Sequence, residues 1–162
     1  MKRISYEQSL LFNEPNSPQL VLDFIKDGEC LCDGAQLLML DLENALELVE
    51  IYTHKFPLCD EAELKLFELH DAEKFIKVYI KEFSFCREAE VKLFELENAK
   101  EVVEEYIKFY PFFHDAELKL LELKDAEDLI RGYLLKYNIS EVVQQTLIKQ
   151  GKFDLLKKYV TG

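Results

Sequence analysis

The chain repeats itself every 27 residues. The octet AELKLFEL begins at Ala62, AEVKLFEL begins at Ala89, AELKLLEL begins at Ala116, and a weaker copy, AQLLMLDL, begins at Ala35. A fixed period of this size is the signature of an array, in which one small structural unit is stacked on copies of itself. The period therefore constrains the architecture strongly and the chemistry of the protein very little.

Aligned in register, the copies form a single repeat domain that covers residues 1–162. The full repeats are 33–59, 60–86, 87–113 and 114–140, with a degenerate repeat before them at 6–32 and a capping repeat after them at 141–162. End repeats of an array are expected to differ from inner ones, because one of their faces has no neighbour to cover it.

The second half of each repeat predicts an α-helix. In the third full repeat Ala99, Val102, Val103 and Tyr106 follow the spacing i, i+3, i+4, i+7, which places them on one helical face. An Asn or Asp precedes each such helix and is expected to be its N-cap: Asn44, Asp71, Asn98 and Asp125. Two aromatic columns are expected to pack in the core, namely Tyr52, Tyr79, Tyr106 and Tyr133, and Phe56, Phe83, Tyr110 and Tyr137.

The first half of each repeat, AELKLFEL, partly alternates but has a helix-favouring composition. Asp60 and Glu63 have the spacing of a capping box. The pairs Glu61 with Lys65, Glu88 with Lys92, and Asp115 with Lys119 have the favourable i,i+4 order for ion pairs. Two helices joined by one or two residues must fold back as a hairpin. Stacked hairpins predict an all-α fold, a right-handed α-solenoid.

The unit AELKLFELxDAExxIxxYI resembles 27-residue helical repeats of uncharacterised bacterial proteins, within the broad HEAT-like and tetratricopeptide-like α-solenoid architecture. The resemblance implies an array and a bacterial origin, and it supplies no catalytic residues. A leucine-rich-repeat-like α/β solenoid is the alternative fold, since 27 residues suits its repeat. Its expected Asn is missing, because Phe67, Phe94 and Leu121 stand at that position.

Charge and hydropathy narrow the possible partners. The net charge is −12, which repels phosphate backbones and argues against nucleic-acid binding. The sequence contains neither a run of 18 apolar residues nor a signal peptide, so no membrane segment is expected and the predicted location is the cytoplasm. The four cysteines are then expected to be free thiols.

Side chains that suggest chemistry fall into columns of the repeat. Cys32, Cys59 and Cys86 form one column that continues with Phe113, which suggests a buried apolar slot rather than a metal site. His54, His70 and His114 share no register, and no catalytic or phosphate-binding motif occurs. We therefore predict a protein that is not an enzyme and that has no cofactor and no metal.

Function is expected where the repeat fails to repeat. In many solenoids the second helices line the surface that binds an extended partner. The candidate partner-binding residues are the variable, outward positions of these helices: Lys74, Lys77, Lys81, Glu101, Glu104, Lys108, Asp128 and Arg131. The hypothesis is a scaffold that binds a protein or peptide. Structural self-association is the alternative, and a metal-binding protein or enzyme comes third.

Overall fold

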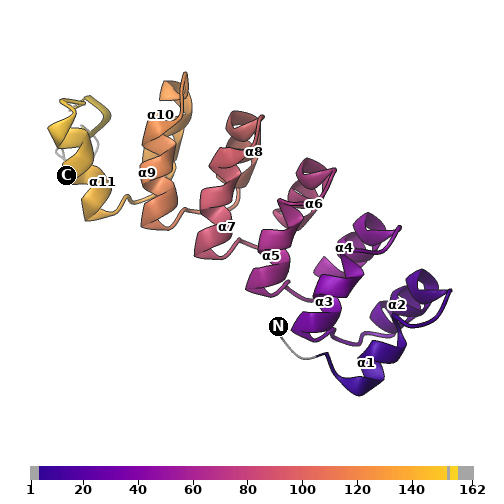
Figure 1. The fold of residues 1–162 in the computed structure, drawn as a ribbon. Coiled ribbons are helices and arrows are strands. Elements are labelled where there is room, and N and C mark those ends of the chain that lie inside the picture. The colour runs from indigo at the N-terminus through magenta and orange to yellow at the C-terminus, as the bar shows by residue number, and fades with distance from the viewer. Residues whose placement is uncertain (1–3, 153, 157–162) are drawn as a thin grey trace. The chain divides into compact units, whose positions relative to one another are not determined.

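A computed structural model describes residues 4–152 and 154–156, and in this part of the chain all regular structure is helical (Figure 1). The helices are α1 (Tyr6–Leu10), α2 (Ser17–Lys26), α3 (Asp33–Met39), α4 (Ala45–Thr53), α5 (Asp60–Leu66), α6 (Ala72–Tyr79), α7 (Arg87–Lys92), the short 3₁₀ helix η1 (Leu93–Glu95), α8 (Ala99–Tyr106), α9 (His114–Glu122), α10 (Glu127–Lys136) and α11 (Glu141–Lys149). The all-α prediction is confirmed. The α/β alternative is wrong for the described residues, because it requires a strand in every repeat.

The chain divides into two compact units, which are the N-terminal part (residues 1–89) and the C-terminal part (residues 90–162). In the N-terminal part the helices pack in two rows, since α2 contacts α4, α4 contacts α6, and α3 contacts α5. The buried face of the first row includes Val21, Leu48 and Ile76. In the C-terminal part α8 packs on η1 and α9 packs on α11. Its core includes Leu93 and Val103.

The two aromatic columns differ in burial. Tyr52, Tyr79, Tyr106 and Tyr133 are at most 1% exposed, so the prediction of a core role is confirmed. The second column is only partly buried, and each of its rings packs against the tyrosine four residues earlier. Their ring centroids lie between 5.1 Å (Tyr133 and Tyr137) and 5.9 Å (Tyr79 and Phe83) apart. This second column therefore shields the tyrosines at the edge of the core.

The predicted N-caps are right in position for three helices and wrong for the fourth. Asn44, Asp71 and Asn98 occupy the N-cap positions of α4, α6 and α8, but none of these side chains makes a capping hydrogen bond. Helix α10 begins at Glu127, so Asp125 is not its cap; Asp125 has a φ of 51°. Asp tolerates this left-handed conformation better than most residues, because its short side chain can hydrogen-bond locally. Its role is to turn the chain between α9 and α10.

A buried glutamate on α5 accepts two hydrogen bonds. Glu63 Oε1 accepts from the hydroxyl of Tyr79 at 2.6 Å, and Glu63 Oε2 accepts from the backbone N–H of Cys86 at 2.6 Å. Glu63 is 4% exposed, and this burial raises the pKa of its carboxyl group. The predicted capping box is wrong, because the N-cap of α5 is Cys59, and Asp60 is already the first helical residue.

Equivalent hydrogen bonds occur in the next two repeats, and we call each set a carboxylate clamp. Glu90 accepts from the Tyr106 hydroxyl and the Phe113 N–H, both at 2.7 Å, and Glu117 accepts from the Tyr133 hydroxyl and the Ser140 N–H, both at 3.1 Å. Each clamp ties the first helix of a repeat to its second helix and to the last residue of the same repeat, directly before the following repeat. Both acceptor oxygens are used, as the burial of a carboxylate requires.

Glutamine takes the place of glutamate in the same register of an earlier repeat. Gln36 Oε1 accepts from the N–H of Cys59 at 2.7 Å. Its Nε2 atom donates to the Leu31 carbonyl at 3.0 Å and to the Tyr52 hydroxyl at 3.2 Å. The backbone N–H is thus the donor that carboxylate and amide have in common, whereas the tyrosine hydroxyl donates to Glu63 and accepts from Gln36.

The cysteine column is explained by its backbone. The N–H groups of Cys59 and Cys86 donate to the buried Gln36 and Glu63, and the N–H of Cys32 donates to the half-buried Gln8. As predicted, none of these three cysteines forms a disulfide bond. Any residue except proline supplies the same N–H, so Phe113 and Ser140 can continue the column. Phe113 is 52% exposed, so the predicted buried apolar slot is wrong at that position.

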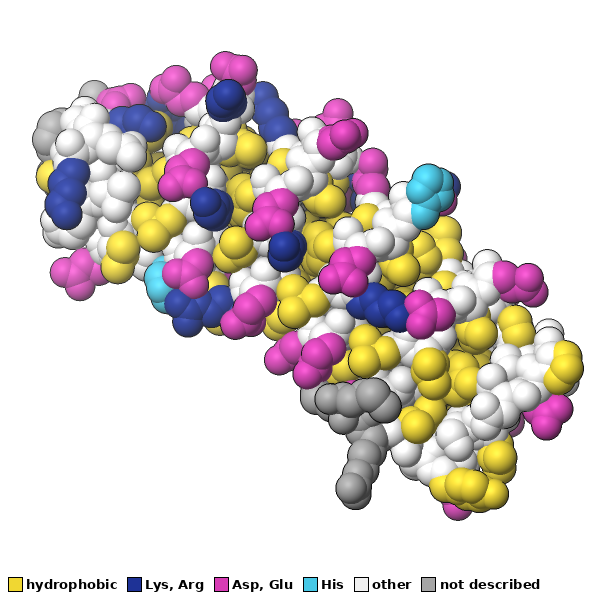
Figure 2. All heavy atoms as spheres, in the orientation of Figure 1, with side chains coloured by type: hydrophobic (Ala, Val, Ile, Leu, Met, Phe, Trp, Pro, Cys, Tyr) yellow, Lys and Arg dark blue, Asp and Glu magenta, His cyan; other side chains and the backbone are white. Residues whose placement is uncertain are grey.

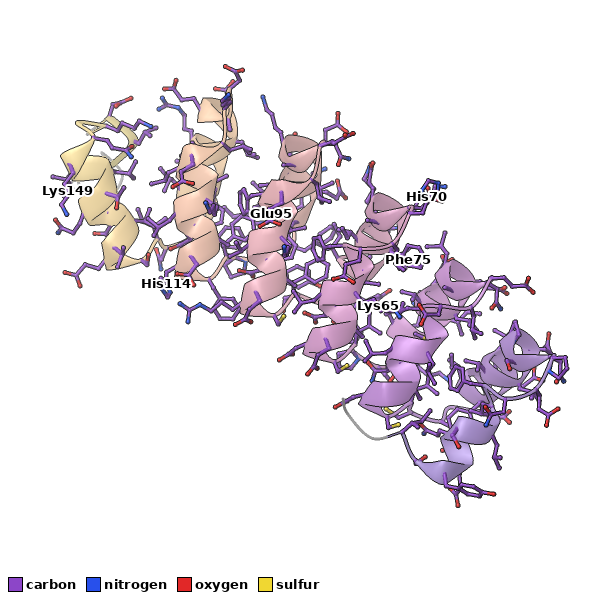
Figure 3. The ribbon with its side chains drawn as sticks, in the orientation of Figure 1. Lys65, His70, Phe75, Glu95, His114 and Lys149 are labelled. Atoms are coloured by element: carbon purple, nitrogen blue, oxygen red, sulfur yellow. The ribbon has the colours of Figure 1, made fainter. Side chains whose placement is uncertain are left out.

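The lysines of the first helices form ion pairs with acids beyond those named in the sequence analysis. Lys65 pairs with Asp41 at 2.6 Å, Lys92 pairs with Glu95 at 2.7 Å, and Lys119 pairs with Glu122 at 3.0 Å. Figure 2 shows acidic side chains with lysines beside them on this face, and Figure 3 labels Lys65 and Glu95. A salt-screened, solvated surface results, in which each pair stabilises the fold little.

Candidate binding groove

The eight candidate partner-binding residues lie on or directly after α6, α8 and α10, and all are exposed except Lys77, which is half-buried. In the N-terminal part Lys74 pairs with Asp71 at 3.0 Å and Lys77 pairs with Glu73, so both charges are balanced on their own helix. Lys81 lies just after α6. Charge is therefore the feature that distinguishes these three residues.

Three of the candidates meet in one groove of the C-terminal part. Glu104 and Lys108 from the α8 side and Asp128 from α10 line a cavity of about 390 Å³. The other candidates of this part lie outside it. Glu101 is exposed on α8, and Arg131 on α10 pairs with Glu127 at 3.6 Å and with Asp154 at 3.7 Å.

The groove has an apolar floor. Ile107 from the α8 side and Leu129 and Tyr133 from α10 line it, together with Gly132. A Cβ atom added at Gly132 would meet no atom within 4 Å, so the missing side chain leaves open space. A glycine inside a helix costs about 0.5–1 kcal/mol relative to alanine. The fold tolerates that cost here, and the result is a hollow between two second helices.

Three lysines stand around this floor. Lys100 Nζ donates to the Asp125 carbonyl at 2.5 Å, and Lys136 Nζ donates to the carbonyls of Ile107, at 3.1 Å, and Lys108. These acceptors are neutral, so they hold the two ammonium groups in place without cancelling their charge. Lys108 is different, since it bonds Glu105 Oε2 at 2.6 Å, and this hydrogen bond raises its pKa.

The sequence predicts three of the charged residues of the groove, Glu104, Lys108 and Asp128, but not the glycine that opens it. Gly132, Lys100 and Lys136 were outside the predicted set. The signal was present, because Gly132 occupies the column of Ile51, Val78 and Glu105. Reading only charged positions as functional excluded a position whose side chain is absent.

The histidines and acids do not assemble into a second site. His54 pairs with Glu82 at 3.1 Å and His114 with Asp115 at 2.9 Å, while His70 lies on the turn between α5 and α6 (Figure 3). Across the described residues, no group of three or more His, Cys, Asp and Glu side chains is gathered as metal ligands would be. In the same part of the chain, no helix has both the length and the apolarity needed to cross a bilayer.

Comparisons of the chain with protein-family models, with curated proteins and with solved structures found no match. The groove's own geometry is therefore the ground for a functional proposal.

Proposed function

We propose that this protein is a right-handed α-solenoid with a 27-residue period that acts in the cytoplasm as a non-enzymatic scaffold and binds a peptide or protein partner. The arrangement as a solenoid is supported by the helix rows of the N-terminal part and by the carboxylate clamps, each of which joins the two helices of a repeat to the residue directly before the next repeat. The observation that carries the binding function is the groove between α8 and α10.

The groove has the composition of a recognition site. An apolar floor gives a partner's side chain a place to leave water, and polar groups around it fix orientation. It lies between second helices, which in many solenoids line the binding surface. That second argument is an analogy at the level of architecture, so the groove itself has to be tested.

A displayed library of random peptides, selected against the full chain, tests the proposal. We expect enriched sequences that bind the purified protein in solution and compete with one another for one surface. Failure to enrich any peptide above the background of an unrelated helical protein would contradict a peptide-binding function.

One observation favours self-association as a second candidate. Helix α1 buries none of its residues, and Tyr6 and Leu10, one helical turn apart, are 80% and 50% exposed. Sedimentation velocity over a range of concentrations tests this. The candidate predicts a rising mass that the double variant Tyr6→Ser, Leu10→Ser abolishes, whereas a wild-type monomer at every concentration contradicts it.

A further inference from the structure

We infer that the groove between α8 and α10 binds an acidic peptide segment of another protein, with one bulky apolar side chain seated over Gly132. This inference rests on the proposed interaction function and specifies the chemistry of its partner. Three departures from the repeat, all in this helix pair, support it.

The first departure is the hollow itself. Gly132 replaces the half-buried side chains found at Ile51, Val78 and Glu105, and the floor that it uncovers is formed by Ile107, Leu129 and Tyr133. A leucine or phenylalanine side chain placed there would exchange water for apolar contact on several sides. The absence of Cβ also lets the partner approach the helix backbone closely.

The second departure is apolar surface at the carboxyl ends of the same helices. Phe109 is 49% exposed and Leu135 is 62% exposed. In the other full repeats the column of Phe109 contains Lys55, Glu82 and Lys136, and the column of Leu135 contains His54, Lys81 and Lys108. Exposed apolar residues that replace charged ones, next to a groove, indicate a surface that a partner covers.

The third departure is charge. Three lysines, Lys100, Lys108 and Lys136, line the groove beside two acids, Glu104 and Asp128, in a chain whose net charge is −12. Lys108 is already paired with Glu105, so Lys100 and Lys136 are the two cations that remain for a partner. Lys100 and Lys136 hydrogen-bond backbone carbonyls, which carry no negative charge to balance the ammonium groups. Carboxylates on either side of the apolar residue would complement this rim. A second copy of this acidic chain is disfavoured as occupant, because two such copies repel each other.

The equivalent place in the N-terminal part supplies a matched control. Fifty-four residues before Gly132 and Lys136 stand Val78 and Glu82, and Glu82 is bonded across to His54 on the α4 side at 3.1 Å. The α4–α6 pair therefore has the side chain of Val78 at the position of Gly132. It has the carboxylate of Glu82 at the position of Lys136.

The test uses the full-length protein and fluorescent peptides of defined sequence. The probe is a short peptide with a central Leu flanked by Glu and Asp; its controls replace the Leu with Ser, or the acids with Lys. Binding is measured by fluorescence anisotropy at low and high salt. We expect the acidic Leu peptide to bind best, with affinity falling as salt rises.

Gly132→Val restores the side chain of the equivalent column and is the decisive variant. Gly132 does not have a positive φ, and a Cβ atom there would lie in open space, so we expect the variant to keep the fold. Circular dichroism checks this. We expect a loss of at least about tenfold in affinity for Gly132→Val, and about two- to fivefold for Lys100→Gln or Lys136→Gln. Val78→Ile should leave binding unchanged.

The outcomes separate the two proposals. Equal binding to Gly132→Val, or a preference for the Lys peptide, overturns this inference while a peptide-binding function stands. Self-association that Gly132→Val abolishes identifies a second copy as occupant and also overturns it. If neither the defined peptides nor the displayed library yields a binder, the proposed function itself is contradicted.

Discussion

The carboxylate clamp at Glu63 makes a prediction that separates hydrogen bonding from charge. In Glu63→Ala two buried donors lose their acceptor, the hydroxyl of Tyr79 and the N–H of Cys86. Each orphaned donor costs about 1–3 kcal/mol, so the variant should lose about 2–6 kcal/mol of unfolding free energy. In Glu63→Gln the amide can bond as Gln36 does, and the expected loss is within about 1 kcal/mol.

The contribution of the Glu63 carboxyl group to stability depends on pH, and the direction of this dependence follows from its pKa. Burial raises the folded-state pKa of Glu63 above its ordinary value of 4.5. The folded protein therefore holds this proton more tightly than the unfolded chain. Stability from this group is fully present below the unfolded pKa and is lost as pH rises through the folded pKa. Glutamine does not titrate, so Glu63→Gln should gain stability relative to wild type as pH rises over that window.

Urea unfolding followed by circular dichroism, repeated across pH values, measures both effects. Glu68→Ala is the matched control, since this exposed acid lies just after the same helix and should change stability by less than about 0.5 kcal/mol. The reasoning is refuted if Glu63→Ala is as stable as the control. It is refuted in a different way if Glu63→Gln is as damaging as Glu63→Ala, because charge rather than hydrogen bonding would then be the requirement.

Three further predictions concern other residues. Gly28 has a φ of 89°, so Gly28→Ala should destabilise by about 1 kcal/mol, whereas Gly132→Ala should stabilise by about 0.5–1 kcal/mol; thermal melts compare them. Burial raises the pKa of Cys86 to about 12, so its thiol should be alkylated more slowly than exposed Cys30, as peptide mass spectrometry would reveal. Tyr133→Phe removes a hydroxyl that both donates and accepts a buried hydrogen bond, so chemical denaturation should show a loss of about 1–3 kcal/mol.

Helix positions and the tyrosine core could be predicted from the sequence because periodicity reports burial directly. The clamps could not. Glu63, Glu90 and Glu117 are identical in three repeats, yet a charged residue is read as exposed unless its partners are known. Those partners lie 16 and 23 residues away. Helix and strand periodicities relate only residues close in sequence, so they do not pair positions this far apart. One of the two donors is also a backbone N–H, which is the same for every residue type except proline.

The groove was predictable only in part, for a related reason. Charged positions such as Lys108 stand out in a comparison of columns, and they do line the groove. What opens the groove is the absence of a side chain at Gly132, and its significance depends on which atoms lie nearby. Likewise Lys100 differs from Lys108 in its hydrogen-bond acceptor, neutral in one case and charged in the other.

Because one donor of each clamp is a backbone N–H, whole repeats could be removed from the chain or added to it. Removal of residues 60–86 would take out Glu63, Tyr79 and Cys86 together and join Cys59 to Arg87. Gln36 would still meet the N–H of Cys59, because that bond does not depend on the residue after Cys59. We therefore expect that the 27-residue segment can be removed or duplicated as a unit. Shortened and lengthened chains are expected to fold, since the junction needs only a peptide N–H, which every residue except proline provides.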